Sequence, residues 1–239
     1  MIDKNSRAYV FIFAFLVCAV SSFTLSLVSE ALRPRQEFNA DIDVKKNILK
    51  AARLQEPLPA GADGAAVARV FADKMEGVVL DLQGNVVTGR RPESLKATEA
   101  LLPLYIYKDG GAPVAYVFPV EGKGLWSTVY GYLAIGADAI TVRGISFYRH
   151  GETPGLGAEV EQEWFRKGFE GKKIFDVDLR RLRPVEIVKG RVVDSVPVAD
   201  RDYYVDGISG ATMTGRGVNA FLKERLGAYE PFLARIRRM

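Results

Sequence analysis

The sequence predicts an α+β protein in which one N-terminal transmembrane helix precedes a single extramembrane domain, built on an antiparallel or mixed sheet with flanking helices. Three features of the 239-residue chain lead to this fold class. An uncharged run lies near the N-terminus, short β-branched and aromatic runs broken by glycine begin near Gly77, and segments with helical spacing lie before and after those runs.

The uncharged run, Ala8 to Val28, is long enough for a helix to cross the roughly 30 Å hydrocarbon core of a bilayer. A cleaved signal peptide is the alternative, because Lys4 and Arg7 precede the run and Ser29–Ala31 has small residues at both ends. The run is longer than the usual apolar core of a signal peptide, which favours a retained anchor. The charges do not decide the orientation, since two arginines also follow the run.

We expect four segments along the chain: an N-terminal tail (1–7), the transmembrane helix (8–28), a helical connector (29–60) and the extramembrane domain (61–239). The connector has apolar residues at helical spacing, namely Ile42 or Val44, Ile48, Ala51 and Ala52, and a loop is expected from Pro57. A second short helix is expected over 65–75, with Val67, Val70 and Phe71 on one side.

Four runs rich in β-branched or aromatic residues predict the sheet: 77–87, 102–120, 127–135 and 139–149. The break at Lys108–Gly111 divides the second run into the two strands of a hairpin. A further strand is expected over 185–193. Tyr130 and Tyr132 are expected to be core or edge aromatic residues of the sheet.

Two helices are expected after the sheet. The first covers 157–171 and would pack Val160, Trp164 and Phe165 onto the strands. The second is the C-terminal run from residue 217, and it is expected to be interrupted at Gly227 and Pro231.

Composition excludes several classes of function. The net charge is only +4 and the cations are scattered among 29 acidic residues, so a nucleic-acid partner is not expected. Cys18 and His150 are the only residues of their kinds, which excludes intrachain disulfides and a Cys/His zinc site made by this chain alone. No metal site is therefore expected, and redox chemistry would need a bound cofactor.

The segment from Asp206 to Thr214 could carry such a cofactor. Glycines at 207 and 210 and Ala211 remove bulk, so another molecule could approach the backbone closely. If a helix begins near Gly215, its free N–H groups and dipole would favour a phosphate at Thr212. The alternative is a helix N-terminus capped by a hydroxyl of Ser209, Thr212 or Thr214.

Two further segments have the composition of a binding surface. In the first, His150–Val160, Pro154 stiffens a glycine-rich turn that presents Leu156 from a loop, where its apolar side chain could lie on a flat ring. In the second, Glu121–Ile135, Trp126 follows a turn with glycines at a strand start. The first segment is equally compatible with an ordinary strand-to-helix connection, and His150 with a structural or surface role. Trp126 is equally compatible with a core or edge aromatic residue.

Together the three segments resemble those of a known family. Asp206–Thr212, DGISGAT, fits the flavinylation pattern D-x-x-S/T-G-A-T/S, and HGETPGLGAEV and GKGLWSTVYGYLA resemble segments of the C subunit of the sodium-translocating NADH:quinone oxidoreductase. The similarity extends to the N-terminal run, KKNILKAARL and GVNAFLKERLG, and so covers most of the chain.

The resemblance implies FMN held covalently through its phosphate by Thr212, within the motif that also contains Ser209, Gly210 and Ala211. It implies that Asp206 is recognised by a separate flavin transferase. It also implies that Trp126 and a loop border the isoalloxazine ring, with Thr153 and Leu156 as the closest candidates. The loop residues are Glu152, Thr153, Gly155, Leu156 and Gly157.

The resemblance further implies a redox subunit of a respiratory complex that oxidises NADH, reduces ubiquinone and exports sodium. The expected place is the bacterial inner membrane, with the N-terminus in the cytoplasm and the flavin domain on the periplasmic side. The expected partners are other membrane subunits of the complex, including an iron–sulfur membrane pair that supplies electrons and a second covalent-FMN subunit that receives them.

Two other functions stay open at this stage. The flavin-binding G subunit of an Rnf-type electron transport complex resembles the chain at ETPGLG and SGAT, but GKGLWSTVYGYLA and KKNILKAARL favour the first family. The other is a membrane-tethered binding module without flavin, in which SGATMT is only a capped helix entrance.

Overall fold

The computed structural model describes residues 7–54, 63–96 and 98–237. Outside them lie residues 1–6 of the expected tail, the end of the expected connector with the loop from Pro57, and residues 61 and 62. The chain divides into two compact units, Met1–Asp43 and Val44–Met239.

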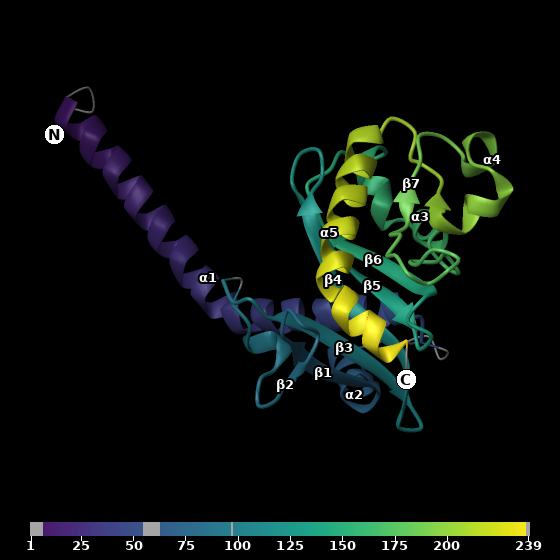
Figure 1. Ribbon diagram of the computed structural model, residues 1–239. Helices are drawn as coiled ribbons and strands as arrows, with labels where there is room; N and C mark the ends of the chain where they lie inside the picture. Colours follow the sequence, from purple (N-terminus) through teal and green to yellow (C-terminus); the bar gives the residue numbers. More distant parts are fainter. Residues whose placement is uncertain (1–6, 55–62, 97, 238–239) are drawn as a thin grey trace. The chain divides into compact units, whose positions relative to one another are not determined.

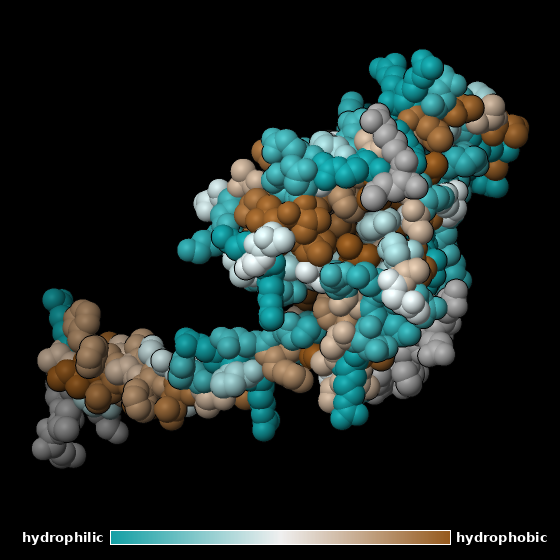
Figure 2. All heavy atoms as spheres, turned by 60° about the horizontal axis from the view of Figure 1, so that its bottom comes forward, coloured by the Kyte–Doolittle hydropathy of each residue, from teal (hydrophilic) through white to brown (hydrophobic). Residues whose placement is uncertain are grey.

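The first unit is the N-terminal part of helix α1, which runs from Arg7 to Ala52. Its apolar side chains are exposed, with Phe11 at 76% and Leu25 at 72% exposure. In Figure 2 the brown and tan spheres of these residues lie at the N-terminal part of the helix, and hydrophilic residues follow them. This helix is long and apolar enough to cross a membrane.

The second unit is built on a six-stranded sheet in the order β2-β1-β3-β4-β5-β6, and every neighbouring pair is antiparallel. The strands are β1 (Met75–Leu80), β2 (Val86–Val87), β3 (Leu102–Asp109), β4 (Ala112–Lys123), β5 (Thr128–Gly136) and β6 (Val142–Arg149). The expected hairpin is confirmed, because β3 and β4 join through Gly110 and Gly111, both with positive φ. The predicted α+β fold is therefore confirmed.

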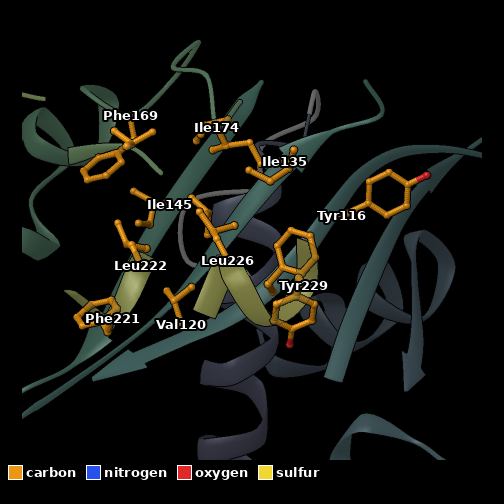
Figure 3. Packing of buried hydrophobic residues seen from close by; sticks show 14 of the residues in the cluster. Tyr116, Val120, Ile135, Ile145, Phe169, Ile174, Phe221, Leu222, Leu226 and Tyr229 are labelled. Atoms are coloured by element: carbon orange, nitrogen blue, oxygen red, sulfur yellow. The ribbon is translucent and has the colours of Figure 1, made fainter. Parts of the chain in front are cut away.

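One face of the sheet carries helix α5 (Thr212–Ile236), which crosses β4, β5 and β6 in Figure 1. Figure 3 shows Leu222, Leu226 and Tyr229 of this helix beside apolar side chains of the strands. The Tyr229 ring lies 4.5 Å from the ring of Phe118 on β4. Burial of this helix face fixes α5 on the sheet and places its first residue at the sheet's margin.

The expected interruptions of the C-terminal helix at Gly227 and Pro231 are wrong, since α5 is continuous through both. Proline in a helix removes one backbone hydrogen bond and costs about 3 kcal/mol. Buried Tyr229, Phe232 and Leu233 flank that position and offset the cost.

The opposite face of the sheet is covered by the last turns of α1 and by α2 (Gly64–Lys74). Ser146 Oγ of β6 donates a hydrogen bond of 2.9 Å to the Asn47 carbonyl, and Arg143 Nε donates one of 2.6 Å to the Ala52 carbonyl. Phe71 of α2 packs edge-on against Tyr105 of β3. The helical segments expected before the sheet are thus confirmed.

A smaller lobe connects β6 to α5. It contains two 3-10 helices (Gly157–Glu161 and Val198–Tyr203), α3 (Glu163–Lys167), α4 (Val192–Ser195) and the parallel pair β7 (Glu186–Ile187) and β8 (Tyr204–Val205). Two expectations are corrected here. The strand expected over 185–193 has only two residues, and the helix expected over 157–171 is two short pieces.

Trp164 was expected to pack on the sheet with Val160 and Phe165, and this is wrong for Trp164 alone. Val160 and Phe165 are buried, whereas Trp164 is 53% exposed and meets Phe165 edge-on. Successive residues of a helix point in different directions, so Phe165 faces the core while Trp164 lies partly in solvent.

Tyr229→Phe is expected to destabilise this unit by about 1–2 kcal/mol. The buried phenol donates a hydrogen bond of 2.6 Å to the Pro103 carbonyl, and its removal leaves that carbonyl without this donor. The measurement is urea unfolding of the full chain in detergent. Tyr130→Phe is the control, because Tyr130 is only half-buried, and it is expected to change the free energy of unfolding by less than about 0.5 kcal/mol.

Candidate functional site

Three segments distant in sequence meet beside the N-terminus of α5. They are the turn 206–211 before the helix, the loop Gly124–Ser127 between β4 and β5, and the loop 150–157 after β6. Leu125, Trp126 and Ser127 each donate a backbone N–H to the Glu152 carboxylate, at 3.1, 2.9 and 3.3 Å. Thr214 of α5 donates its hydroxyl to the same carboxylate at 2.6 Å.

Glycines, which have no side chain, let these segments approach one another. A Cβ added at Gly157 would lie 2.5 Å from Thr214 Oγ1, and one added at Gly210 would lie 2.6 Å from Leu156 Cδ2. Gly210 also has a φ of 74°, a conformation that side chains rarely adopt. These two glycines bring parts of the chain itself together, and the close approach of another molecule at Gly207, Gly210 and Ala211 stays an expectation.

The helix begins at Thr212 and not near Gly215 as expected. Its N-cap residue is Ala211, and no side chain makes a capping hydrogen bond there, so the alternative of a hydroxyl cap is wrong. Thr212 is exposed, whereas Thr214 is 1% exposed and bound to Glu152. The two hydroxyls of this turn therefore have opposite accessibility.

A cavity of about 730 Å³ lies beside Thr212. Its walls come from the turn 207–211, the first turns of α5 and the segment 187–191. Three exposed cations line it, namely Lys189, Arg191 and Arg216. Cations together with the first N–H groups of a helix form an environment that favours a phosphate. An FMN phosphate at Thr212 thus fits the residues present.

Two apolar side chains are exposed at the same margin: Trp126 at 70% and Leu156 at 41%. Thr153 and Gly155 are also exposed, and the Thr153 carbonyl accepts hydrogen bonds from the N–H groups of Leu156 and Ala158. Glu152 differs from these neighbours, since only 5% of it is exposed and its carboxylate points into the protein.

The three segments of the site lie within a domain of known type. An FMN-binding domain model matches residues 124–227, the span that contains all three. The C subunit of the Na(+)-translocating NADH-quinone reductase of Pseudomonas aeruginosa is 33% identical over 267 residues, which cover 100% of this chain and 99% of that protein. This chain belongs to the family of the Na(+)-translocating NADH-quinone reductase C subunit.

Other members of this C subunit family agree. The protein of the same name from Vibrio anguillarum is 34% identical, with 93% of each chain covered. The solved structure of the C subunit from Parabacteroides distasonis superposes with a TM-score of 0.72 at 32% identity, covering 84% of this chain and 96% of that one. The resemblance read from the motifs is confirmed, and family membership together with α1 indicates membrane association.

Asp206, the first residue of the flavinylation pattern, lies at one edge of the site formed by the three segments. Its Oδ1 accepts a hydrogen bond of 2.7 Å from the Val192 N–H and so joins the turn to α4. Sequence reasoning missed Lys189 and Arg191, because nothing in the local pattern shows that 187–191 lies beside the turn. It also missed Arg216, although this residue follows Thr212 closely in α5. It also missed the role of Thr214, whose partner is 62 residues away.

The Glu152 carboxylate is ionised within this site. Burial raises the pKa of the Glu152 carboxyl, but the hydrogen bonds from Thr214 and from three backbone N–H groups outweigh burial and hold the pKa below its ordinary value of 4.5. Four donors therefore stabilise a negative charge in the protein.

This shift predicts a pH dependence of stability. Since the folded-state pKa is depressed, the ionised carboxylate adds stability that is present above about pH 4.5 and is lost as the pH falls through the lowered value. Glu152→Gln is expected to flatten the decline in unfolding free energy as the pH falls below about 4.5. Glu224→Gln, which changes an exposed carboxylate on α5, is expected to keep the wild-type slope in the same denaturant titrations.

Proposed function

We propose that this chain is a redox subunit of a sodium-translocating NADH:ubiquinone reductase and that it holds FMN covalently through a phosphoester to Thr212. The observation that carries the proposal is the exposed hydroxyl of Thr212 at the first residue of α5, within DGISGAT and beside the basic cavity. Membership of the C subunit family and the FMN-binding domain match support it.

Each part of the site has a role in holding the cofactor. The Thr212 hydroxyl is the attachment point, and Lys189, Arg191 and Arg216 with the helix N-terminus offset the charge of the phosphate. Trp126 and Leu156 offer apolar surface for the ring. When bound, FMN supplies the electron-carrying chemistry, and the polypeptide supplies its position and electrostatic surroundings.

The proposal also covers assembly and location. The segment 8–28 anchors the chain in the bacterial inner membrane, 29–60 connects it to the FMN-binding domain (61–239), and that domain lies on the periplasmic side. A flavin transferase attaches the cofactor and recognises Asp206. The partners are the other membrane subunits, among them an iron–sulfur pair and a second covalent-FMN subunit, in a complex that couples NADH oxidation and ubiquinone reduction to sodium export.

Intact-mass measurement with peptide mapping tests the proposal. The full chain is produced in a bacterial host with its flavin transferase and purified in detergent. We expect an added mass equal to one FMN less one water, on the peptide that contains Thr212. A matured sample with the mass of the bare polypeptide would contradict the proposal.

A further inference from the structure

The Glu152 carboxylate has its full set of hydrogen-bond partners. Oε1 accepts the N–H groups of Trp126 and Ser127, and Oε2 accepts the Leu125 N–H and the Thr214 hydroxyl. A carboxylate offers about four lone-pair positions, so no acceptor capacity is left for a ligand.

The carboxylate also has little free space around it. A Cβ added at Gly124 would lie 2.7 Å from Glu152 Oε1, and one added at Gly157 would lie 2.8 Å from Oε2. Two glycines thus lie against the carboxylate on two sides. Because they have no side chain, the backbone can pack closely enough to bury it. The carboxylate is therefore surrounded by atoms of the protein itself.

The four donors come from two elements of the site, and Glu152 itself belongs to a third. Leu125, Trp126 and Ser127 lie in the loop between β4 and β5, while Thr214 lies in the first turn of α5. No described side chain other than that of Glu152 makes hydrogen bonds to both. One buried anion therefore links the loop Gly124–Ser127 to Thr214 by hydrogen bonds, in addition to the packing of α5 against the end of β4.

We propose that Glu152 is a positioning residue that joins the loop Gly124–Ser127, called the Trp126 loop below, to the first turn of α5, so that the surface beside Thr212 exists before any cofactor is attached. Its link to the flavin rests on the proposed function, but the joining of the two segments does not. Glu152 then differs from Thr153 and Leu156, whose exposed side chains remain the candidates for contact with the ring.

Hydrogen–deuterium exchange of the full chain in detergent tests the joining directly. Glu152→Gln replaces an acceptor oxygen by an NH₂ group that faces N–H donors, so exchange of the amides 125–127 is expected to become about tenfold faster. Thr214→Val keeps the carboxylate and removes only the bond from α5, and faster exchange in the same loop is expected. Thr214→Ser restores the donor and is expected to return exchange toward the wild-type rate.

Glu224→Gln is the matched control, because it removes an exposed carboxylate of α5 and is expected to leave loop exchange unchanged. A second readout is the visible circular dichroism of samples with attached flavin, which reports the asymmetry of the ring's surroundings. We expect this spectrum to change in Glu152→Gln and Thr214→Val and to keep its wild-type form in Glu224→Gln.

The outcomes separate the two proposals. Wild-type loop exchange in both Glu152→Gln and Thr214→Val would overturn the positioning role. If Glu152→Gln does not fold, Thr214→Val and Thr214→Ser decide the question, because they leave the buried charge in place. A wild-type protein without flavin would overturn the proposed function only, since the exchange experiment needs no cofactor.

Discussion

Thr212→Val is expected to abolish covalent flavin attachment, whereas Thr214→Val is expected to keep its flavin on the peptide position of Thr212. Both changes replace a hydroxyl by a methyl group of similar size, so the difference between them depends on accessibility. Thr212 is exposed at the start of α5, whereas the Thr214 hydroxyl is buried and donated to Glu152. A transferase cannot reach a hydroxyl that is buried in this way.

The measurement is flavin fluorescence in a denaturing gel, with intact mass as confirmation. Thr212→Ser is the matched control, because it keeps a hydroxyl at the same position and is expected to stay fluorescent. Fluorescence in Thr212→Val together with a dark Thr214→Val would show that attachment occurs two residues later than we propose. Thermal unfolding of each variant checks that a dark band reflects lost attachment and not a lost fold.

The sheet could be predicted from the sequence because its signals are local. Alternating β-branched and aromatic runs and the glycines at 110 and 111 lie in consecutive residues, and the strands pair with their neighbours along the chain from β3 to β6. The lobe between β6 and α5 could not be predicted in the same way. Its elements are two to six residues long, too short for a periodic pattern.

The candidate site was predictable in its segments and not in its contacts. Each of the three segments carries glycines and polar residues that mark a turn. Which side chain meets which depends on the closing of the sheet, so no local signal shows that the Glu152 carboxylate accepts the Thr214 hydroxyl. The start of α5 was predicted a few residues too late, near Gly215, because the glycine-rich segment before it is typical of a turn, whereas the helix begins at Thr212. Tertiary packing outweighs the low helix propensity of glycine there.

Gly217→Ala is expected to destabilise the domain by about 1–3 kcal/mol, whereas Gly227→Ala on the same helix is expected to stabilise it by about 0.5–1 kcal/mol. Alanine favours a helix interior over glycine by about 1 kcal/mol, so propensity alone would predict a gain at both positions. The surroundings differ. A Cβ at 217 would lie 2.3 Å from the Lys123 carbonyl oxygen and 3.1 Å from Gly124 Cα, and one at 227 would have no atom within 4 Å.

The clash at position 217 is with backbone atoms, which cannot rotate away as a flexible side chain can. Relief requires α5 to move from the end of β4, where the Trp126 loop begins, and this movement would separate the parts of the site that Glu152 joins. Urea unfolding in detergent measures the stability change, and in-gel fluorescence is expected to show less attached flavin in Gly217→Ala than in Gly227→Ala. Equal stability of the two variants would mean that α5 does not depend on this close approach to β4.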